Sequence, residues 1–365
     1  GVGAEGIDYA GAIDRLLVKL ETGSPDDTTL WLARWLTGNA DLSETDALAA
    51  VQTVDDLDSE GKRSSVRNLI FTALRATGRD SLQADSAYAA DYARGYAALE
   101  LAFPGIGNED TNPYQGSVNL FASRIRTELG GDIEFLIPGG DLIVGLSNTP
   151  EQITDISKVT NFRDKGSLGM VTVSDGSIVG FARDDVLVNQ SRILTVGGGD
   201  ILLWSSEGDI DAGKGKKTAA TVPPPIIKVD KDGNVTLELQ GAATGSGIGA
   251  LTPVGGLAGD VDLIAPKGTV NAGDAGIRAG NLSIAAQVVL GADNISVSGS
   301  SAGTPVADTS AVTAASSGAS NAGGDVSSTT AALSQNLADA ARAAEELKQA
   351  FKPTFITTEV VGHGD

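Results

Sequence analysis

Cysteine is absent from this chain of 365 residues, and histidine and methionine occur only once each. A chain without cysteine forms no disulfides, offers no thiolate ligands for zinc and has no cysteine nucleophile. A single histidine also argues against a transition-metal site, because imidazole is the other common ligand for such metals. The lack of cysteine fits a cytosolic protein, or an exported one that crosses a membrane unfolded.

Basic residues are scarce as well. There are 26 lysines and arginines against 47 aspartates and glutamates, which gives a formal net charge of −21. This imbalance predicts no nucleic-acid partner, because phosphate neutralisation needs a basic surplus, and it disfavours docking on anionic lipid. The same charge opposes self-association and predicts a monomer. No run approaches eighteen apolar residues, so no membrane-spanning helix is predicted.

Aromatic residues make up only 4% of the chain, whereas glycine occurs 47 times. Aliphatic residues therefore supply most of the apolar surface, and this composition suits many short strands joined by tight corners. The length allows two or three domains. Because the chain begins with Gly1, we expect it to be a piece of a longer protein or a processed product.

Residues 1–104 show helical periodicity and are predicted to form a helical domain or an insertion. Gly78 is predicted to end the third of the helices, and Pro104-Gly105 the last. An aromatic stripe on the last helix is interpreted as core packing, with a binding groove as the alternative. The apolar stripes comprise Ile13, Leu16, Leu17 and Leu20; Leu30, Trp31, Ala33 and Leu36; Val66, Leu69, Ile70, Ala73 and Leu74; and Tyr88, Tyr92, Tyr96, Leu99 and Phe103.

Residues 105–299 change to a period of two and are predicted to form a parallel β-solenoid. Short strands restart after Gly-Asp pairs that are nine residues apart, at Gly131 and Gly140 and again at Gly199 and Gly208. Gly259-Asp260 and Gly268-Thr269 repeat that spacing and predict two further strands. Restarts at fixed intervals without two-residue hairpins are typical of stacked coils.

The alternation predicts which side chains fill the solenoid, and the Gly-Asp pairs predict its corners. The glycine is expected to adopt positive φ, and the aspartate is expected to accept hydrogen bonds from backbone N–H groups at the corner. The side chains predicted to point inward are Ile133, Phe135, Ile137, Ile201, Leu203, Ile210, Ala212, Val261 and Leu263.

Three segments are predicted to depart from the coils. An excursion at about 214–239 begins with Lys214, Lys216 and Lys217, continues with three prolines and contains a hairpin around residues 230–234. Residues 300–330 are rich in serine, alanine and glycine and are predicted to be a flexible linker. Residues 331–365 combine an amphipathic helix with a strand-like stretch and are predicted to cap the solenoid.

The motif search assigns no catalytic, cofactor-binding or metal-binding residues. Gly299–Gly303 matches the G-x-S-x-G elbow, with Asp308, Asp325 and His363 downstream, but it opens the serine-rich linker instead of a strand-turn-helix. Residues 230–234 begin like a calcium loop yet lack its turn glycine and closing glutamate. Residues 245–250 match a loose dinucleotide pattern without a following helix. No cofactor is therefore predicted, and weak calcium binding at the acidic surface is kept as an alternative.

Four asparagines begin N-x-[ST] sequences: Asn189, Asn234, Asn281 and Asn294. They are interpreted as residues that shape turns and ladders instead of glycan sites. Arg183, Asp184 and Asp185 form the nearest linear cluster for an enzyme that cleaves polysaccharide, and a turn is the preferred interpretation.

Several stretches together resemble the C-terminal region of the filamentous haemagglutinin family. They are YARGYAALELAFPG from Tyr92, GGDIEFLIPGGDLIVGL, DVLVNQSRILTVGGGDILLWSSEGDIDAGKGKKT, VPPP, and GDVDLIAPKGTVNAGDAGIRAGNLSIAA. The resemblance covers about residues 88–299 and extends to the terminal helix and the closing ITTEVVGHGD. It implies a two-partner secretion passenger that crosses the outer membrane of a Gram-negative bacterium through a dedicated transporter and folds outside as a right-handed β-helix.

Three functions follow as hypotheses. The preferred one is a non-catalytic C-terminal module of a large secreted or cell-surface adhesin, which mediates attachment or caps the β-helical filament. Its ligand on host cells, bacterial surfaces or matrix is unidentified. The first alternative is a secretion or anchoring element that interacts with the outer-membrane transporter. The second is a β-helical enzyme that acts on polysaccharide.

Overall fold

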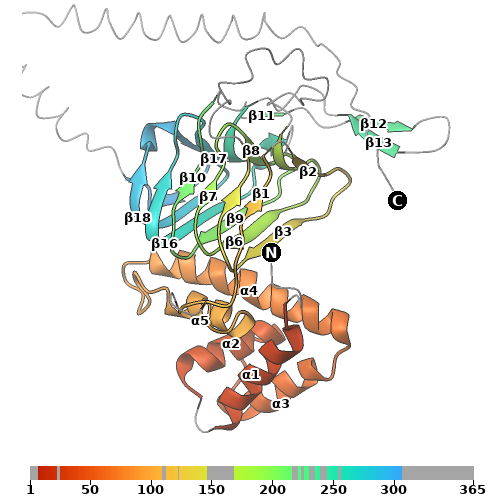
Figure 1. Ribbon diagram of the computed structural model, residues 1–365, viewed down its shortest axis with the longest axis vertical. Helices are drawn as coiled ribbons and strands as arrows, with labels where there is room; N and C mark the ends of the chain where they lie inside the picture. Colours follow the sequence, from red (N-terminus) through yellow and green to blue (C-terminus); the bar gives the residue numbers. More distant parts are fainter. Residues whose placement is uncertain are drawn as a thin grey trace, which may run out of the picture. The chain divides into compact units, whose positions relative to one another are not determined.

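The computed structural model describes residues 7–22, 25–108, 112–121, 123–145, 168–215, 221–222, 226–229, 235–238, 245–253 and 256–305. Within these residues, helices come first and short strands follow (Figure 1). Residues 230–234, residues 306–330 of the predicted linker and the predicted helix and strand of 331–365 lie outside the described residues.

The helices begin where polar residues can cap them. Asp8, Asp26, Ser43 and Asp58 each accept a hydrogen bond from the backbone N–H three residues further on, which satisfies one of the free donors at a helix start. No helix in the described part of the chain is both long and apolar enough to cross a bilayer. The helices are α1 (Tyr9–Glu21), α2 (Asp27–Thr37), α3 (Glu44–Asp55), α4 (Ser59–Ser81) and α5 (Ala93–Ala102).

The prediction that Gly78 ends its helix is wrong, because α4 continues through Gly78 to Ser81. The glycine serves helix-to-sheet packing instead. A Cβ at this position would lie 2.3 Å from Cδ1 of Ile264 on a strand, so glycine allows the close approach.

The aromatic stripe also departs from the prediction. The last helix begins only at Ala93, and Tyr88 and Tyr92 precede it. Tyr88 instead lies under the guanidinium of Arg94, 3.5 Å from the ring centroid. Tyr92 and Tyr96 both make edge-to-face contacts with Trp204. Apart from Tyr88, the stripe therefore packs in the core, as interpreted from the sequence, although a single helix does not carry it.

The strands build a β-helix-like stack. Every strand pair among the described residues is parallel except β12–β13, and successive coils align in register. One column of aligned positions contains Ile133, Ile178, Ile201, Val261 and Leu282.

The stack has two sheets, and the longest strand of the larger one pairs with one short strand along its beginning and with another along its end. Its strands are β1 (Val118–Asn119), β3 (Ile133–Ile137), β4 (Leu142–Ile143), β6 (Ile178–Ala182), β7 (Val186–Leu187), β9 (Ile201–Ser205), β10 (Ile210–Asp211), β16 (Val261–Asn271), β18 (Leu282–Leu290) and β20 (Ser301–Ala302). The second sheet contains β2 (Arg124–Thr127), β5 (Gly169–Thr172), β8 (Arg192–Thr195), β14 (Gly247–Ala250), β17 (Ile277–Ala279) and β19 (Ile295–Val297).

Two features differ in detail from the predicted strands. The restart expected at Gly268 is not a new strand, because β16 runs through it and only shifts its register against β18 between Ala265 and Thr269. The hairpin in the excursion is present as β12 (Ile226–Val229) paired antiparallel with β13 (Val235–Glu238). A short parallel pair, β11 (Thr221–Val222) with β15 (Thr252–Pro253), accompanies it.

Aliphatic side chains fill the interior of the stack. Eight of the nine residues predicted to point inward are buried there, and Phe135 is partly buried against the same cluster. On β6, β9, β16 and β18, side chains that point away from this interior pack into the core of the helices instead. These are Val179, Phe181, Leu202, Trp204, Ile264 and Ala285. The helical bundle and the coils therefore share a hydrophobic core, with α4 lying across the strands (Figure 1).

Candidate functional site

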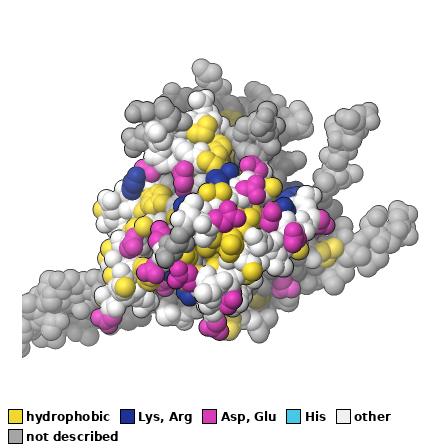
Figure 2. Space-filling model, turned by 90° about the horizontal axis from the view of Figure 1, so that it is seen from below, with side chains coloured by type: hydrophobic (Ala, Val, Ile, Leu, Met, Phe, Trp, Pro, Cys, Tyr) yellow, Lys and Arg dark blue, Asp and Glu magenta, His cyan; other side chains and the backbone are white. Residues whose placement is uncertain are grey.

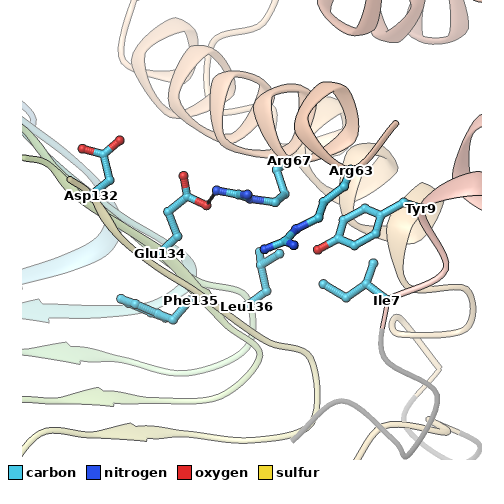
Figure 3. Close-up of a pocket in the computed structure, with 8 residues that line it drawn as sticks. All are labelled: Ile7, Tyr9, Arg63, Arg67, Asp132, Glu134, Phe135 and Leu136. Atoms are coloured by element: carbon cyan, nitrogen blue, oxygen red, sulfur yellow. Dashed lines mark hydrogen bonds and ion pairs between the residues drawn. The ribbon is translucent and has the colours of Figure 1, made fainter. Parts of the chain in front are cut away.

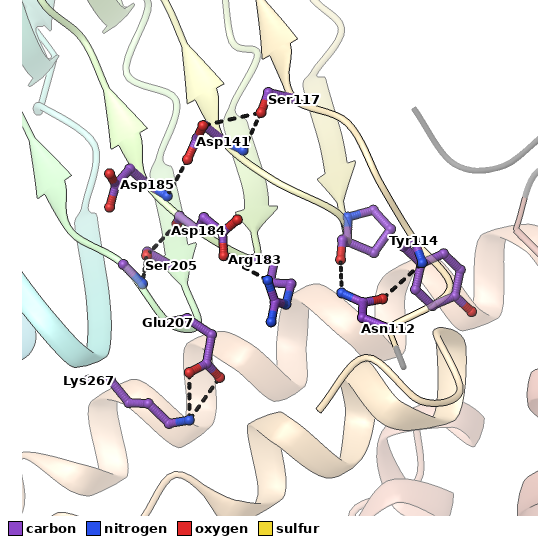
Figure 4. A network of polar contacts seen from close by, with 12 residues as sticks. Asn112, Tyr114, Ser117, Asp141, Arg183, Asp184, Asp185, Ser205, Glu207 and Lys267 are labelled. Carbon is purple, nitrogen blue, oxygen red and sulfur yellow. Dashed lines mark hydrogen bonds and ion pairs between the residues drawn. The ribbon is translucent and has the colours of Figure 1, made fainter. Parts of the chain in front are cut away.

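The corners of the coils carry columns of polar side chains. Asp141 accepts from the backbone N–H of Asp185 at 3.1 Å, Asp185 accepts from that of Asp209 at 2.7 Å, and Asp209 accepts from that of Thr269 at 2.7 Å. Figure 4 shows the beginning of this column, where the Asp141 N–H donates in turn to Ser117 Oγ. Each corner thus binds the equivalent residue of the next coil, as the sequence predicted for the aspartates.

A second column runs along the neighbouring corner. The Asp132 carboxylate accepts a hydrogen bond from the Ser177 N–H, and the Ser177 hydroxyl oxygen accepts one from the Asp200 N–H. The Asp200 carboxylate in turn accepts a hydrogen bond from the Asp260 N–H. The column ends where Asn281 Oδ1 accepts from the Ser300 N–H at 3.0 Å. These residues stabilise the stack, because each satisfies a backbone donor that faces the adjacent coil.

The reason predicted for the corner glycines is wrong at most positions. Gly131 has φ of 95°, but Gly140, Gly199, Gly208, Gly259 and Gly268 do not adopt positive φ. These glycines are needed for close stacking. A Cβ at Gly199 would lie 2.0 Å from the carbonyl oxygen of Gly176, and one at Gly259 would lie 2.1 Å from that of Gly199.

The asparagines of the sequons behave as turn and ladder residues where they are described. Asn189 has φ of 57° and donates to the Gly145 carbonyl at 3.0 Å. Asn294 donates to the Gly273 carbonyl at 2.5 Å, and Asn281 belongs to the second column. Asn234 lies outside the described residues.

The cluster of Arg183, Asp184 and Asp185 lies in the turn between β6 and β7, as preferred from the sequence. Arg183 pairs with Asp184 at 3.1 Å, and Asp185 belongs to the first column (Figure 4). Burial raises the pKa of Asp184, and the nearby Arg183 opposes that rise. Each member of the cluster therefore has a structural contact.

The two enzyme-like motifs take other conformations. In G-x-S-x-G, Ser301 lies on β20 and accepts from the Thr304 hydroxyl at 3.0 Å, while Asp308, Asp325 and His363 lie outside the described residues. The loose dinucleotide motif leads into strand β14 instead of a helix. Over the described ranges, no three acidic or histidine side chains gather as a metal site would require.

A polar cleft lies between the helices and the first coil, and no motif predicted it. Its volume is about 520 Å³. Arg67 of α4 forms an ion pair with Glu134 of β3 across the cleft (Figure 3). Burial raises the pKa of Tyr9 at its rim, although Arg67 and Arg63 act in the opposite direction. The lining residues are Ile7, Tyr9, Arg63, Arg67, Asp132, Glu134, Phe135 and Leu136.

The chemistry of this cleft suits binding. The Asp132 carboxylate already accepts a hydrogen bond from the Ser177 N–H, and the Glu134 carboxylate is paired with Arg67. Arg63 keeps half of its side chain exposed, forms an ion pair with Glu60 at 3.5 Å and hydrogen-bonds with Tyr9. Acidic side chains elsewhere are spread over the molecular face seen in Figure 2, among hydrophobic ones. The half-exposed guanidinium of Arg63 is therefore a hydrogen-bond donor that a ligand in the cleft can reach.

The parallel strand pairing and the polar columns at the corners together define a β-helix-like scaffold, on the side of which a helical bundle packs. Residues 198–306 match the model of a family described as "Filamentous haemagglutinin family outer membrane protein". The match runs from the turn between β8 and β9 through β20, and it supports a filamentous-haemagglutinin-family region there, in agreement with the resemblance read from the sequence. No curated protein and no solved structure matches the chain.

Proposed function

We propose that the chain is a non-catalytic module from the C-terminal part of a secreted or cell-surface adhesin of a Gram-negative bacterium. The observation that carries the proposal is how the coils use their side chains. The interior is aliphatic, and the acidic corner residues bond to the next coil. The family description of residues 198–306 supports the surface location.

The proposal includes a right-handed β-helix and a cap formed by residues 331–365. Right-handed connections between parallel strands of one sheet predominate strongly in proteins, which supports the handedness. Val288 and Leu290 on β18 are each about half exposed. Apolar side chains near the last coil support a cap, because stacked repeats need a covered end.

We also propose that an outer-membrane two-partner secretion transporter is the export partner. The chain has no cysteine that oxidation could trap during passage. Each coil provides hydrogen-bond acceptors for the next, so coils that emerge in sequence order can add one at a time.

Adhesion is tested with the purified chain coupled to beads, which are incubated with host cells, bacteria and matrix polysaccharides. The proposal expects bead retention on at least one of these surfaces above that of albumin-coated beads. Retention on none would contradict the adhesive role. In a parallel assay, cleavage of acidic polysaccharides that is lost in Asp184→Asn and Asp185→Asn variants would contradict the non-catalytic assignment.

A further inference from the structure

We propose that the free edge of β3 and the cleft beside it form a docking groove for an extended strand of a partner polypeptide that carries an acidic side chain opposite Arg63. This goes beyond the proposed function, because it assigns a particular site and a mode of recognition. The groove lies at the end of the stack that the first coil forms.

The first observation is the unpaired edge. Strand β3 ends the order of its sheet and, among the described strands, pairs only with β6. An edge strand presents backbone N–H and C=O groups, which an additional strand can satisfy. Adding a strand to such an edge is a recurrent mode of peptide recognition, in which backbone pairing supplies affinity and side-chain pockets supply specificity.

The second observation is that space is available along this edge. Asp132, Glu134, Phe135 and Leu136 line the cleft, so it follows nearly the whole length of β3. Five residues of strand span about 17 Å, and a cavity of about 520 Å³ lies within the range of typical ligand pockets. Figure 3 shows α4 and the start of α1 on the other side of this space.

The third observation is the arrangement of charge. Glu134 neutralises Arg67 across the cleft, whereas Arg63 is 52% exposed and its ion pair is with the still more exposed Glu60. Arg63 lies beside the Tyr9 ring, on the helical side of the groove (Figure 3). A guanidinium binds a carboxylate through two parallel hydrogen bonds, so an acidic residue on the bundle-facing side of the docked strand fits this position.

On the β3 side of the groove, Phe135 adds an apolar surface to the acidic Asp132 and Glu134. The ring of Phe135 lies over Gly180 of the next coil, where a Cβ would be 2.0 Å from the ring. Side chains of a strand alternate between its two faces. The partner strand is therefore one in which aliphatic residues facing Phe135 alternate with polar ones, with a carboxylate among the polar residues.

The test is isothermal titration of the intact chain with a blocked octapeptide of alternating valine and threonine in which one central threonine is replaced by glutamate. We expect saturable binding. Arg63→Glu should weaken it at least tenfold and should restore binding of the same peptide with lysine in place of glutamate. Lys19→Glu, an equal charge change at an exposed residue of α1, should leave the affinity unchanged.

A second peptide isolates the backbone pairing. Replacing two alternate residues with proline removes their N–H groups and should abolish binding, and the original peptide should slow hydrogen exchange of β3 amides. Equal binding of both peptides, or no binding of either, overturns the proposal. Binding that appears only after removal of residues 1–6 also overturns it, because the chain itself would then compete for the groove.

Discussion

The guanidinium of Arg79 on α4 donates to both carboxylate oxygens of Asp262 on β16, from Nε at 2.8 Å and from Nη2 at 2.9 Å. The Asp262 side chain is fully buried, and Arg75 approaches it from the same helix at 3.3 Å. The hydrogen bond to Asp262 raises the pKa of Arg79. These residues are 183 positions apart, so the contact joins the helical bundle to a late coil.

Asp262→Asn is expected to lower the free energy of unfolding by about 2–3 kcal/mol. Breaking a buried ion pair usually costs about 3–5 kcal/mol. We expect a loss no larger than the low end of that range, because both arginines keep some access to water. Asp260, which is partly exposed and bonds to Arg79 at 3.1 Å, provides the matched control. Asp260→Asn should cost less than about 1 kcal/mol. Equal losses in urea unfolding would contradict the role of Asp262.

Gly95→Ala is expected to destabilise the protein despite the higher helix propensity of alanine. A Cβ at Gly95 would lie 2.6 Å from Cη2 of Trp204, whose ring is fully buried between Tyr92 and Tyr96. Overpacking of this kind costs about 1–3 kcal/mol. Combining the change with Trp204→Phe should recover part of the loss in thermal unfolding. Additive losses would show that the two positions do not touch.

Gly259→Ala tests the stacking of the corners. Its Cβ would meet the backbone carbonyl of Gly199, which cannot rotate away, and we expect a loss of about 2 kcal/mol or more. Gly107→Ala is the control, since nothing lies within 4 Å of its Cβ position, and it should change stability by less than about 0.5 kcal/mol. A neutral Gly259→Ala in urea unfolding is incompatible with coils stacked this closely.

Asp26 links helix capping to pH. It accepts from the Thr29 N–H at 2.6 Å, and hydrogen bonding to Thr29 lowers the pKa of Asp26 below 3.8. A lowered folded-state pKa stabilises the protein above the unfolded pKa, and this contribution is lost as the pH falls through the folded value. Asp26→Ala should therefore cost about 1 kcal/mol at pH 7 and less at pH 3.

The matched variant for this position is Asp26→Asn. Asparagine caps a helix about as well as aspartate but does not titrate. Its stability relative to the wild type should therefore be nearly unchanged at pH 7. A cost of Asp26→Ala that stays the same from pH 7 to pH 3 would contradict the role of the ionised carboxylate.

The interior and the corners of the coils could be predicted because their causes are local. Alternation places Ile201 and Leu203 on one face, and the aspartates after the corner glycines are acceptors. The conformation of the glycines could not be predicted in the same way. Gly199 needs its missing Cβ because Gly176, in the preceding coil, approaches it, and one isolated pattern does not show that approach.

The sequence also indicates that the outer face of the strands is covered, although the alternation of side chains alone does not reveal it. The strand Ile201–Ser205 is apolar at both alternate sets of positions, which is typical of strands covered on both faces. What covers Trp204 could not be read from this stretch, because Tyr92, Tyr96 and Gly95 lie about a hundred residues earlier. The cleft is harder still to predict from the sequence, since Tyr9, Arg63 and Glu134 belong to three separate segments without a common motif.

The stacking of coils across the excursion is the central claim, and a disulfide tests it most directly. Asp211 and Asn271 are register partners on β10 and β16, and their side chains bond at 3.2 Å although they lie 60 residues apart. Parallel partners lie within the Cα separation that a disulfide spans, and the chain has no other cysteine. Asp211→Cys with Asn271→Cys should crosslink almost completely under mild oxidation, whereas Asp211→Cys with Arg278→Cys should remain reduced. A folded protein in which the first pair fails to crosslink, or in which both pairs crosslink alike, would contradict the stacked coil.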